Sequence, residues 1–346
     1  MTTLRSDTIF GNNDDGPVLD GVLKYTSENY MTLPKGTTAD AFPSFKGAPA
    51  SSARGIFAGG VAEPSPTRYD TIDYVQIATT GNATDFGNLL TINQFPGALA
   101  SSTRGVIVGG FWPALVNTMQ YVTIATTGNA KDFGDLLTAK NQPGACSNST
   151  RGLIAGGNPE TDTVEYIQIQ SSGNSLDFGN LTNSVQNPGG CADLTRAVFA
   201  GGEDSPTTTN VIQYFTIPTQ SNATDFGDLT QTRRLLASGS SPTRGFWFGG
   251  ADTGSTYYDR IDYVTIQTTG NATDFGNLSA ARAEMGAVTS TLRACVGGGY
   301  VGPSTPQTDI VEYITMATAG DMTDFGDLTV ARRQVSGCSN GHGGLA

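Results

Sequence analysis

The sequence repeats itself six times, with a period of 45 to 50 residues. The dipeptide Asp-Phe marks each copy, and successive copies are 47, 45, 48, 49 and 50 residues apart. The six dipeptides begin at Asp85, Asp132, Asp177, Asp225, Asp274 and Asp324. Repetition at this period limits the fold to architectures in which similar units bury their apolar faces against one another.

Three further markers occur in the same order in every copy. The first is an arginine that opens an apolar run, at Arg54, Arg104, Arg151, Arg196, Arg244 and Arg293. The second is a Gly-Gly pair that begins at Gly59, Gly109, Gly156, Gly201, Gly249 and Gly298. The third is a tyrosine, at Tyr74, Tyr121, Tyr166, Tyr214, Tyr263 and Tyr313. Four markers in one order, six times over, exclude a chance pattern.

Each unit predicts four short strands. The first is small and partly apolar, as at residues 285–288. The second, as at residues 105–108, is apolar without alternation, which is typical of a strand buried on both faces. The third, as at residues 121–124, is β-branched and aromatic, and the fourth contains Asp-Phe-Gly. The glycine and asparagine of residues 126–130 predict a hairpin turn between the last two strands.

Four-stranded units of this length predict an all-β, six-bladed β-propeller that spans residues 46–346. An open ring would leave unpaired edges, so a closing strand is expected. Residues 334–339 resemble the first strand of a seventh unit and are predicted to complete the blade at residues 54–93. A rival strand at residues 45–52 has Pro49, which lacks a backbone N–H donor.

The composition excludes several classes of function. The chain has 19 Lys and Arg against 31 Asp and Glu, a formal charge of −12, which would repel nucleic acid. The first fifteen residues are polar and no long apolar run exists, so neither a signal peptide nor membrane insertion is expected. The four cysteines have no metal spacing and His342 is the single histidine, so we expect no metal and no cofactor.

The order of the markers resembles the Kelch repeat, in which a double glycine ends the second strand and a tyrosine lies in the third. Kelch blades usually carry a tryptophan in the fourth strand. This chain has phenylalanine there, at Phe86, Phe133, Phe178, Phe226, Phe275 and Phe325. The resemblance covers about residues 50–346 and implies the propeller fold, but one fold hosts many functions.

A second resemblance concerns the source of the repeat. The text from Tyr121 to Leu136 is similar to repeats in structural proteins of marine bacteriophages. The segment from Leu33 to Thr38 is similar to an LPxGTT stretch of phage tail and fibre proteins. These resemblances imply a virion protein, exposed on the particle after assembly in the host cytoplasm. Residues 1–45 lie outside the repeat and are the expected anchor to other virion proteins.

The repeated polar residues leave alternatives open. The six aspartates of Asp-Phe suggest either calcium loops or strand-end devices that accept backbone N–H bonds or face the repeat arginine. The six arginines suggest either a ligand-binding crown or ties between neighbouring blades. Cys146, Cys191 and Cys338 share one repeat position and are predicted to be small buried residues that are too far apart for disulfides. Three sequons, beginning at Asn82, Asn222 and Asn271, fall in the hairpin turn and are explained by turn chemistry.

The loops after each Gly-Gly pair differ between copies, and function on a repeated scaffold sits in such loops. They cover residues 61–70, 111–118, 158–162, 203–210, 251–260 and 300–309. Their aromatic and cationic residues suit sugar rings or a protein interface, or simply cover the rim. These candidate binding residues are Arg68, Tyr69, Phe111, Trp112, Tyr257, Tyr258, Arg260 and Tyr300. Trp247 lies in a buried second strand and is predicted to be core.

Three functions fit this sequence. The first is a non-enzymatic virion component, such as a tail fibre, an appendage or a head decoration, that binds a host-surface glycan or protein within an oligomeric assembly. The second is a free Kelch-like module that binds protein or carbohydrate. The third is a glycan-active enzyme, but glycoside hydrolysis needs two facing carboxylates in distinct environments, and the acidic residues here mostly follow the repeat.

Overall fold

The structure, a computed structural model, describes residues 53–63, 67–304 and 306–345, together with three short strands near the N-terminus. The chain divides into two compact units, Met1–Phe45 and Lys46–Ala346. In the first unit, β1 (Val18–Leu19), β2 (Leu23–Tyr25) and β3 (Met31–Thr32) form an antiparallel sheet. The anchoring role predicted for residues 1–45 falls largely outside the described residues.

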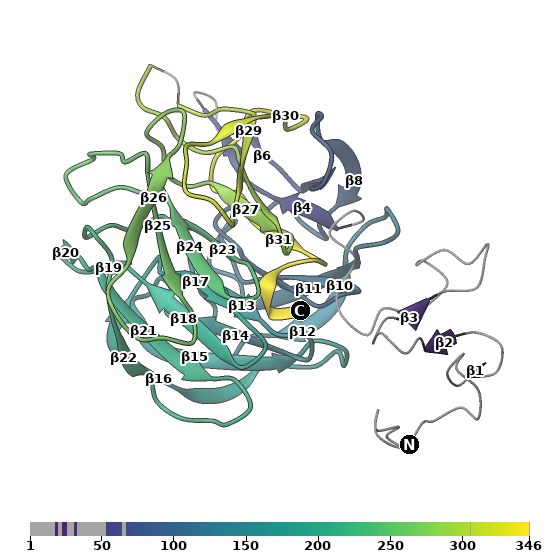
Figure 1. The fold of residues 1–346 in the computed structure, drawn as a ribbon. Coiled ribbons are helices and arrows are strands. Elements are labelled where there is room, and N and C mark those ends of the chain that lie inside the picture. The colour runs from purple at the N-terminus through teal and green to yellow at the C-terminus, as the bar shows by residue number, and fades with distance from the viewer. Residues whose placement is uncertain are drawn as a thin grey trace. The chain divides into compact units, whose positions relative to one another are not determined.

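The second unit is the predicted six-bladed β-propeller, with six four-stranded antiparallel sheets in a ring (Figure 1). Blade 1 contains β4 (Arg54–Ala58), β7 (Thr71–Gln76) and β8 (Thr84–Asn88). Blade 2 contains β9 (Gly97–Ala100), β10 (Arg104–Val108), β11 (Thr118–Thr123) and β12 (Lys131–Asp135). Blade 3 contains β13 (Gly144–Ser147), β14 (Arg151–Ala155), β15 (Thr161–Gln168) and β16 (Leu176–Val185).

The remaining blades follow the same order. Blade 4 contains β17 (Gly189–Ala192), β18 (Arg196–Ala200), β21 (Val211–Thr216) and β22 (Thr224–Asp228). Blade 5 contains β23 (Ala237–Ser240), β24 (Arg244–Phe248), β25 (Arg260–Thr265) and β26 (Thr273–Asn277). Blade 6 contains β27 (Gly286–Thr289), β28 (Arg293–Gly297), β29 (Ile310–Thr315) and β30 (Thr323–Asp327). Two-stranded ribbons in the loops are β5 (Val61–Ala62) with β6 (Thr67–Arg68), and β19 (Glu203–Asp204) with β20 (Thr207–Thr208).

The ring closes through the strand predicted to close it. Strand β31 (Ser336–Ser339) pairs antiparallel with β4 as the inner strand of blade 1, placing Cys338 opposite Ile56. Beyond β31, Asn340 accepts the backbone N–H of Arg54 at 2.7 Å. The two ends of the repeat are therefore joined as the strands within a blade are joined. The rival segment, residues 45–52, lies outside the described residues.

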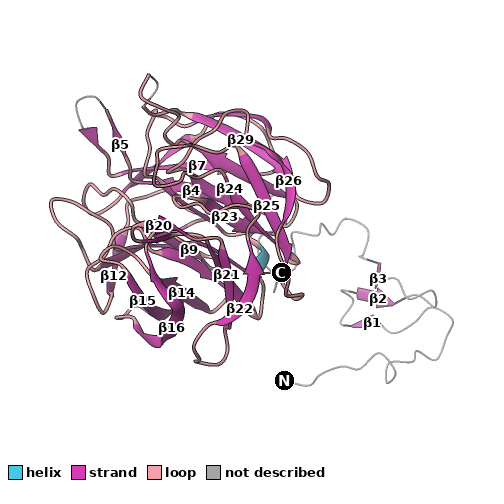
Figure 2. Cartoon of the chain, turned by 90° about the vertical axis from the view of Figure 1, so that its left-hand side faces the viewer, coloured by secondary structure: helices cyan, strands magenta, loops and turns pink. Residues whose placement is uncertain are grey.

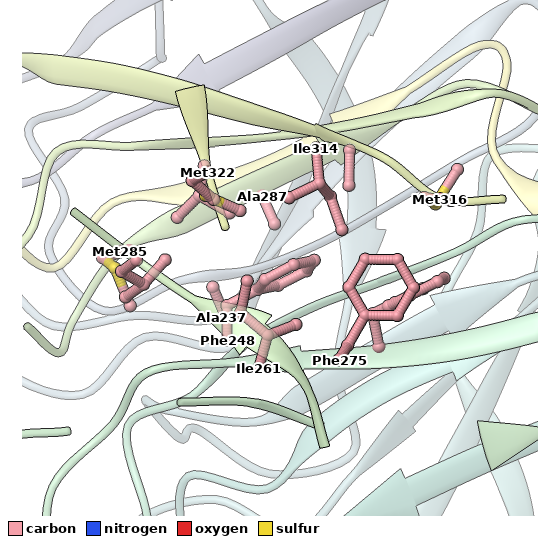
Figure 3. Packing of buried hydrophobic residues seen from close by; sticks show 13 residues of the cluster. Ala237, Phe248, Ile261, Phe275, Met285, Ala287, Ile314, Met316 and Met322 are labelled. Atoms are coloured by element: carbon pink, nitrogen blue, oxygen red, sulfur yellow. The ribbon is translucent and has the colours of Figure 1, made fainter. Parts of the chain in front are cut away.

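The hydrophobic core lies between the blades. The described residues form six clusters of buried apolar side chains, and each cluster draws on two neighbouring blades. Figure 3 shows the cluster between blades 5 and 6, where Phe248 and Phe275 lie against Ile314 and Met322. A further cluster joins blade 6 to blade 1. A single blade could not bury these faces alone, which is the physical reason that the ring closes.

The second strand of every blade is buried along four of its five residues, as the apolar runs predicted. Trp247 on β24 is fully buried and donates its indole N–H to the carbonyl of Gly189 at 3.0 Å. The tyrosine of the third strand meets the phenylalanine of the fourth edge to face in each blade, with ring centroids 5.5 to 6.1 Å apart. Each such pair contributes about 0.5–1.5 kcal/mol beyond the area that it buries.

The turn between the third and fourth strands also covers the outer edge of the preceding blade. The backbone N–H of Gly128 in blade 2 donates to the carbonyl of Phe86 in blade 1 at 2.8 Å. A Cβ on Gly87, whose φ is 142°, would lie 2.6 Å from the Gly128 carbonyl, so Asp-Phe-Gly needs its glycine for this approach. The sequon residue Asn82 accepts the backbone N–H of Asp327 in blade 6 at 3.2 Å, so it bonds between blades, a contact that the predicted turn chemistry did not include.

The repeat arginines tie neighbouring blades together, as one of the two hypotheses proposed. Each guanidinium lies over the tyrosine of its own blade, with Cζ 4.4 to 5.0 Å from the ring centroid. Each also donates from Nη1 to a backbone carbonyl of the next blade, as Arg151 does to Ile217 at 2.7 Å. Because every guanidinium is engaged in this way, the six do not form a free crown.

The prediction for the aspartates of Asp-Phe is wrong. All six are exposed, and within the described residues none accepts a hydrogen bond through its carboxylate or contacts a repeat arginine. The reason is the alternation of the fourth strand, which turns the phenylalanine inward and the preceding aspartate toward solvent. The calcium alternative has no support in the structure, because the described residues contain no group of acidic side chains able to hold a metal ion.

The four cysteines are buried and free. Cys146, Cys191 and Cys338 lie on inner strands of three blades, as predicted from their shared repeat position. Burial raises the pKa of the Cys338 thiol to about 12, so it stays protonated and unreactive at neutral pH.

Acidic side chains inside the interfaces matter more than those of Asp-Phe, and they were missed from sequence. The residue before the repeat tyrosine is buried in every blade and accepts a backbone N–H from the preceding blade. At four interfaces it also pairs with a buried cation that lies eight residues after the Asp of Asp-Phe. The pairs are Glu165–Lys140 at 2.7 Å, Asp262–Arg233 at 2.8 Å, Asp73–Arg332 at 3.1 Å, and Glu312–Arg282.

The other two interfaces show why these positions belong together. They hold Gln120 with Asn93, and Gln213 with Val185, and all four side chains are buried. At all six interfaces, the two positions are thus either both charged or both neutral, which avoids an uncompensated buried ion. The pairing was hidden in the sequence because the two positions lie in different blades.

Candidate binding face

The two ends of the propeller carry different chemistry. Because the strands of a blade are antiparallel, the turns before the repeat arginines and the turns between the third and fourth strands share one end, here called the arginine end. The loops after Gly-Gly share the other end with the connections that lead to the next blade, here called the loop end. Loops and turns are pink in Figure 2.

The C-terminal segment crosses the central channel at the arginine end. After β31, the chain passes Ala100 of blade 2, and its last described residues form the 3-10 helix η3 (Gly343–Leu345), cyan in Figure 2. A Cβ on Gly343 would lie 2.0 Å from the Ser241 carbonyl oxygen, and one on Gly344 would lie 2.0 Å from that of Ser147. The segment thus touches blades on different sides of the ring and closes this end.

His342 holds the closing segment in place. Its Nε2 lies 2.8 Å from the carbonyl oxygen of Ala100, and its Nδ1 accepts the backbone N–H of Gly344 at 3.2 Å. A neutral imidazole with the proton on Nε2 satisfies both contacts. Burial lowers the pKa of His342 to about 4, so it is uncharged at neutral pH.

The loop end opens into a pocket on the propeller axis. Its cavity measures about 120 Å³ and is lined by the connections between blades and by small residues of the inner strands, such as Ala98 and Ala287. One residue from each connection lines its mouth. These six mouth residues are Phe95, Gln142, Asn187, Leu235, Glu284 and Gln334.

The mouth residues are linked around the axis by their backbones. Phe95 donates its N–H to the carbonyl of Gln334 at 3.1 Å, and Gln142 donates to Phe95 at 2.9 Å. The same bond joins Asn187, Glu284 and Gln334 to the mouth residue of the preceding blade, at 2.9 to 3.2 Å. All six have a φ between 55° and 62°, which directs their side chains to the mouth in the same way.

The pocket has one charged side chain at its mouth. Glu284 accepts a hydrogen bond from Arg333 Nη1 at 3.2 Å, and only about a tenth of its side chain is exposed. Burial raises the pKa of this carboxyl above its usual value, and the neighbouring Arg333 guanidinium opposes that rise.

The structure brings two groups of the predicted binding residues together. In the first, Arg68 Cζ lies 3.6 Å from the ring centroid of Trp112, so loops of blades 1 and 2 meet. In the second, Tyr257 and Tyr300 of blades 5 and 6 lie 5.1 Å apart with their rings tilted by 50°. Arg333 lies 5.0 Å from the Tyr300 ring and joins this pair to Glu284 at the pocket mouth.

The other four predicted residues lie at the loop end without joining either group through a side-chain contact. Tyr258 donates its hydroxyl to Asp252 at 3.2 Å, within its own loop. Arg260 reaches Thr230 of blade 4 at 3.5 Å. Tyr69 and Phe111 are half-buried, and their backbones bond to the connection that follows blade 1. Whether any of the eight binds a ligand stays a prediction.

Sequence reasoning missed the six mouth residues. It sought variation only in the loops after Gly-Gly, whereas the residue two places before the first strand also differs between copies. That variation was the available signal. It went unused because nothing in one linear copy shows that six such positions meet on an axis.

Two absences apply to the part of the chain that the structure describes. No cluster of three or more His, Cys, Asp or Glu side chains is placed to hold a metal ion. Nor does any helix there have the length and apolarity to cross a bilayer. In comparisons with known proteins, no family model matches the chain and no curated protein is significantly similar to it.

Proposed function

We propose that this chain is a non-enzymatic virion protein that presents the loop end of its propeller to a glycan or protein on the host surface. The observation that carries the proposal is the difference between the two ends. At the arginine end, all six blades repeat the same contacts and the centre is closed by residues 340–345. At the loop end, the loops differ between blades and carry aromatic and cationic side chains, and a pocket opens on the axis.

Aromatic side chains beside guanidinium and carboxylate groups suit recognition of a partner, since they combine large contact areas with directional polar contacts. The acidic balance of the chain favours a partner other than nucleic acid. The virion context rests on the similarity of residues 121–136 to marine phage structural repeats. Residues 1–45 would then attach the propeller to neighbouring virion proteins in a larger assembly.

One experiment locates the protein on the particle, and a second tests whether its loop end mediates attachment to the host. Antibody-gold labelling of purified particles tests for the protein on the tail or the head, and recombinant protein added to host cells should reduce phage adsorption. Loss of that inhibition in a Trp112→Ala, Tyr257→Ala variant would assign it to the loop end. Absence of the protein from purified particles would contradict the virion proposal.

A free binding module is the second candidate, because the aromatic and cationic groups of the loop end need no particle to act. In that case, the protein would be found outside particles and would still bind a protein or glycan through the same face. A sugar-release assay on host-surface glycans tests the remaining alternative, a glycan-active enzyme.

A further inference from the structure

The axial pocket at the loop end has a cavity of about 120 Å³. Since one water takes up about 30 Å³ of the liquid, this cavity corresponds to the volume of roughly four waters and admits the edge of one sugar ring. Small residues of the inner strands line both this pocket and a second, smaller pocket in the channel, which His342 also lines. A ligand that enters from the loop end meets the six mouth residues first.

The backbone of the mouth residues indicates that their side chains have a use. A left-handed backbone costs a non-glycine residue about 1 kcal/mol or more, and glycine avoids that cost. The chain uses glycine at its other repeated left-handed positions, as at Gly59 and Gly87 and their counterparts. At the mouth, by contrast, none of the six positions is glycine. Glycine would adopt this backbone at a lower cost in free energy, so the side chains retained at these six positions indicate a role beyond folding.

Three residues that line the same pocket each carry a buried polar atom without a partner in the protein. Asn187 Nδ2, Gln334 Oε1 and Ser336 Oγ are buried and have no hydrogen-bond partner from the protein. Their residues are only 7%, 8% and 9% exposed. An unpaired buried polar group costs about 1–3 kcal/mol, so this pocket favours a ligand that both donates and accepts hydrogen bonds. Hydroxyl groups do both.

The apolar part of the wall suits the carbon face of a ring. Phe95, Leu235, Leu236 and Met285 line the pocket beside the polar groups. Beyond its mouth, the pair of Tyr257 and Tyr300 is joined to the pocket through Arg333 and Glu284. Aromatic faces of this kind stack on the weakly polar face of a sugar.

The charges at this edge of the pocket disfavour an anion. Arg333 bonds to Glu284 and Glu63, and Arg234 bonds to Glu203. Three carboxylates thus face two guanidinium groups, and each guanidinium is already neutralised. With an overall charge of −12, the chain would attract neutral ligands more readily than acidic ones.

We propose that the axial pocket binds the terminal unit of an uncharged glycan, with Asn187, Gln334 and Ser336 bonding its hydroxyl groups and Tyr257 and Tyr300 contacting the next unit. The inference rests on the proposed function for its biological setting, and it names the ligand class and the site. The pocket supplies the hydrogen bonds and the tyrosine pair extends the contact along the glycan.

The test uses the full chain and methyl glycosides of glucose, galactose, mannose and N-acetylglucosamine, with N-acetylneuraminic acid as the anionic comparator. Binding is measured by saturation-transfer NMR and by titration. At least one neutral glycoside should bind with a Kd on the order of 1 mM, which corresponds to about 4 kcal/mol. The matching disaccharide should bind more tightly, and Tyr300→Ala should remove that gain.

Matched variants locate the site. Asn187→Leu with Gln334→Phe introduces residues found at the same repeat position in other blades, so the backbone is already known to accept them. This variant should weaken binding at least about tenfold, or about 1.4 kcal/mol, while its thermal unfolding stays close to wild type. Leu292→Ala, which changes an exposed side chain in the turn before Arg293 at the arginine end, should leave monosaccharide binding unchanged.

Three results would overturn the inference: no neutral glycoside binds up to about 50 mM, far above the expected Kd; only the anionic sugar binds; or binding survives in the double variant. If the protein is found on particles and blocks adsorption by binding a host protein, the glycan inference is wrong and the proposed function stands. Glycoside binding by a protein absent from particles would do the reverse.

Discussion

The surfaces where blades meet and the loop end follow opposite rules. Between blades, the same contacts recur around the ring: an arginine over a tyrosine, a turn on an outer strand, and a matched buried pair. At the loop end, the loops after Gly-Gly differ between blades, and the six mouth positions hold five different residue types. Residues that repeat in every blade are therefore those that the fold requires, whereas positions that differ between blades are where a partner can be recognised.

The largest effect is expected from unbalancing a buried pair. Asp262→Ala leaves Arg233 charged and unpaired inside the interface of blades 4 and 5, and it should lower the free energy of unfolding by about 3–5 kcal/mol. Denaturant titration measures this change.

The control for that variant copies a pair that the chain already uses. Asp262→Gln with Arg233→Val reproduces Gln213 and Val185 of the preceding interface and should stay within about 1 kcal/mol of wild type. If the single and double variants lose equal stability, matching of the two positions is not what the interface requires.

The next effect concerns acid. His342 has a folded pKa of about 4 against an ordinary value of 6.5, so the unfolded chain binds the proton more readily between these values. Its contribution to stability is therefore complete above pH 6.5 and is lost as the pH falls toward 4, by on the order of 3 kcal/mol.

Unfolding titrations at pH 7 and pH 4.5 measure this dependence on pH. His342→Gln keeps an N–H donor for the Ala100 carbonyl but cannot titrate, so it should lose a matching part of the pH dependence. Glu284 shifts stability in the opposite sense in both proteins, since burial raises its pKa, and the difference between them isolates His342. Equal pH slopes would refute the assignment.

A smaller loss is expected from a single repeat arginine. Arg151→Ala removes a guanidinium from the Tyr166 ring and a hydrogen bond to the Ile217 carbonyl of the next blade. The site is partly exposed, so the unfolding free energy should fall by about 1–2 kcal/mol. Thermal unfolding measures it, and Arg151→Lys should recover only part, since an ammonium cannot stack as a guanidinium does.

The smallest effect on stability belongs to the loop end. Trp112→Ala and Tyr257→Ala should each change the unfolding free energy by less than about 1 kcal/mol, because both side chains are only half-buried and each has one ring contact, to a loop of the neighbouring blade. Both should nevertheless weaken attachment to host cells in a binding assay. A loop variant that unfolds the ring while a repeat-arginine variant does not would break the comparison.

Much of the fold could be predicted because the same four-strand pattern occurs in all six copies of the repeat. The marker order gave the four strands of each blade, and the partial seventh unit at residues 334–339 gave the closing strand. The function of the repeat arginines also followed, since a residue present in every blade is more simply a tie than a ligand site. The same reasoning gave a wrong prediction for the aspartates of Asp-Phe, because a polar residue can recur merely by lying on the solvent side of a strand.

The candidate site was harder to predict. The loop aromatics could be named from sequence, but their grouping could not, since Tyr257 and Tyr300 come from different blades. The mouth residues looked like ordinary linker positions. Similarly, Asp262 and Arg233 are distant in the chain and become partners only across an interface.

The sequence by itself determined the number of blades, the strands within them and the way the ring closes. These depend on local pattern and on apolar faces that only a neighbouring copy can bury. The tertiary structure decided which end is open, which is closed, and which side chains meet on the axis. Those relations arise only when six distant segments are brought around one centre, and a linear pattern does not encode that geometry.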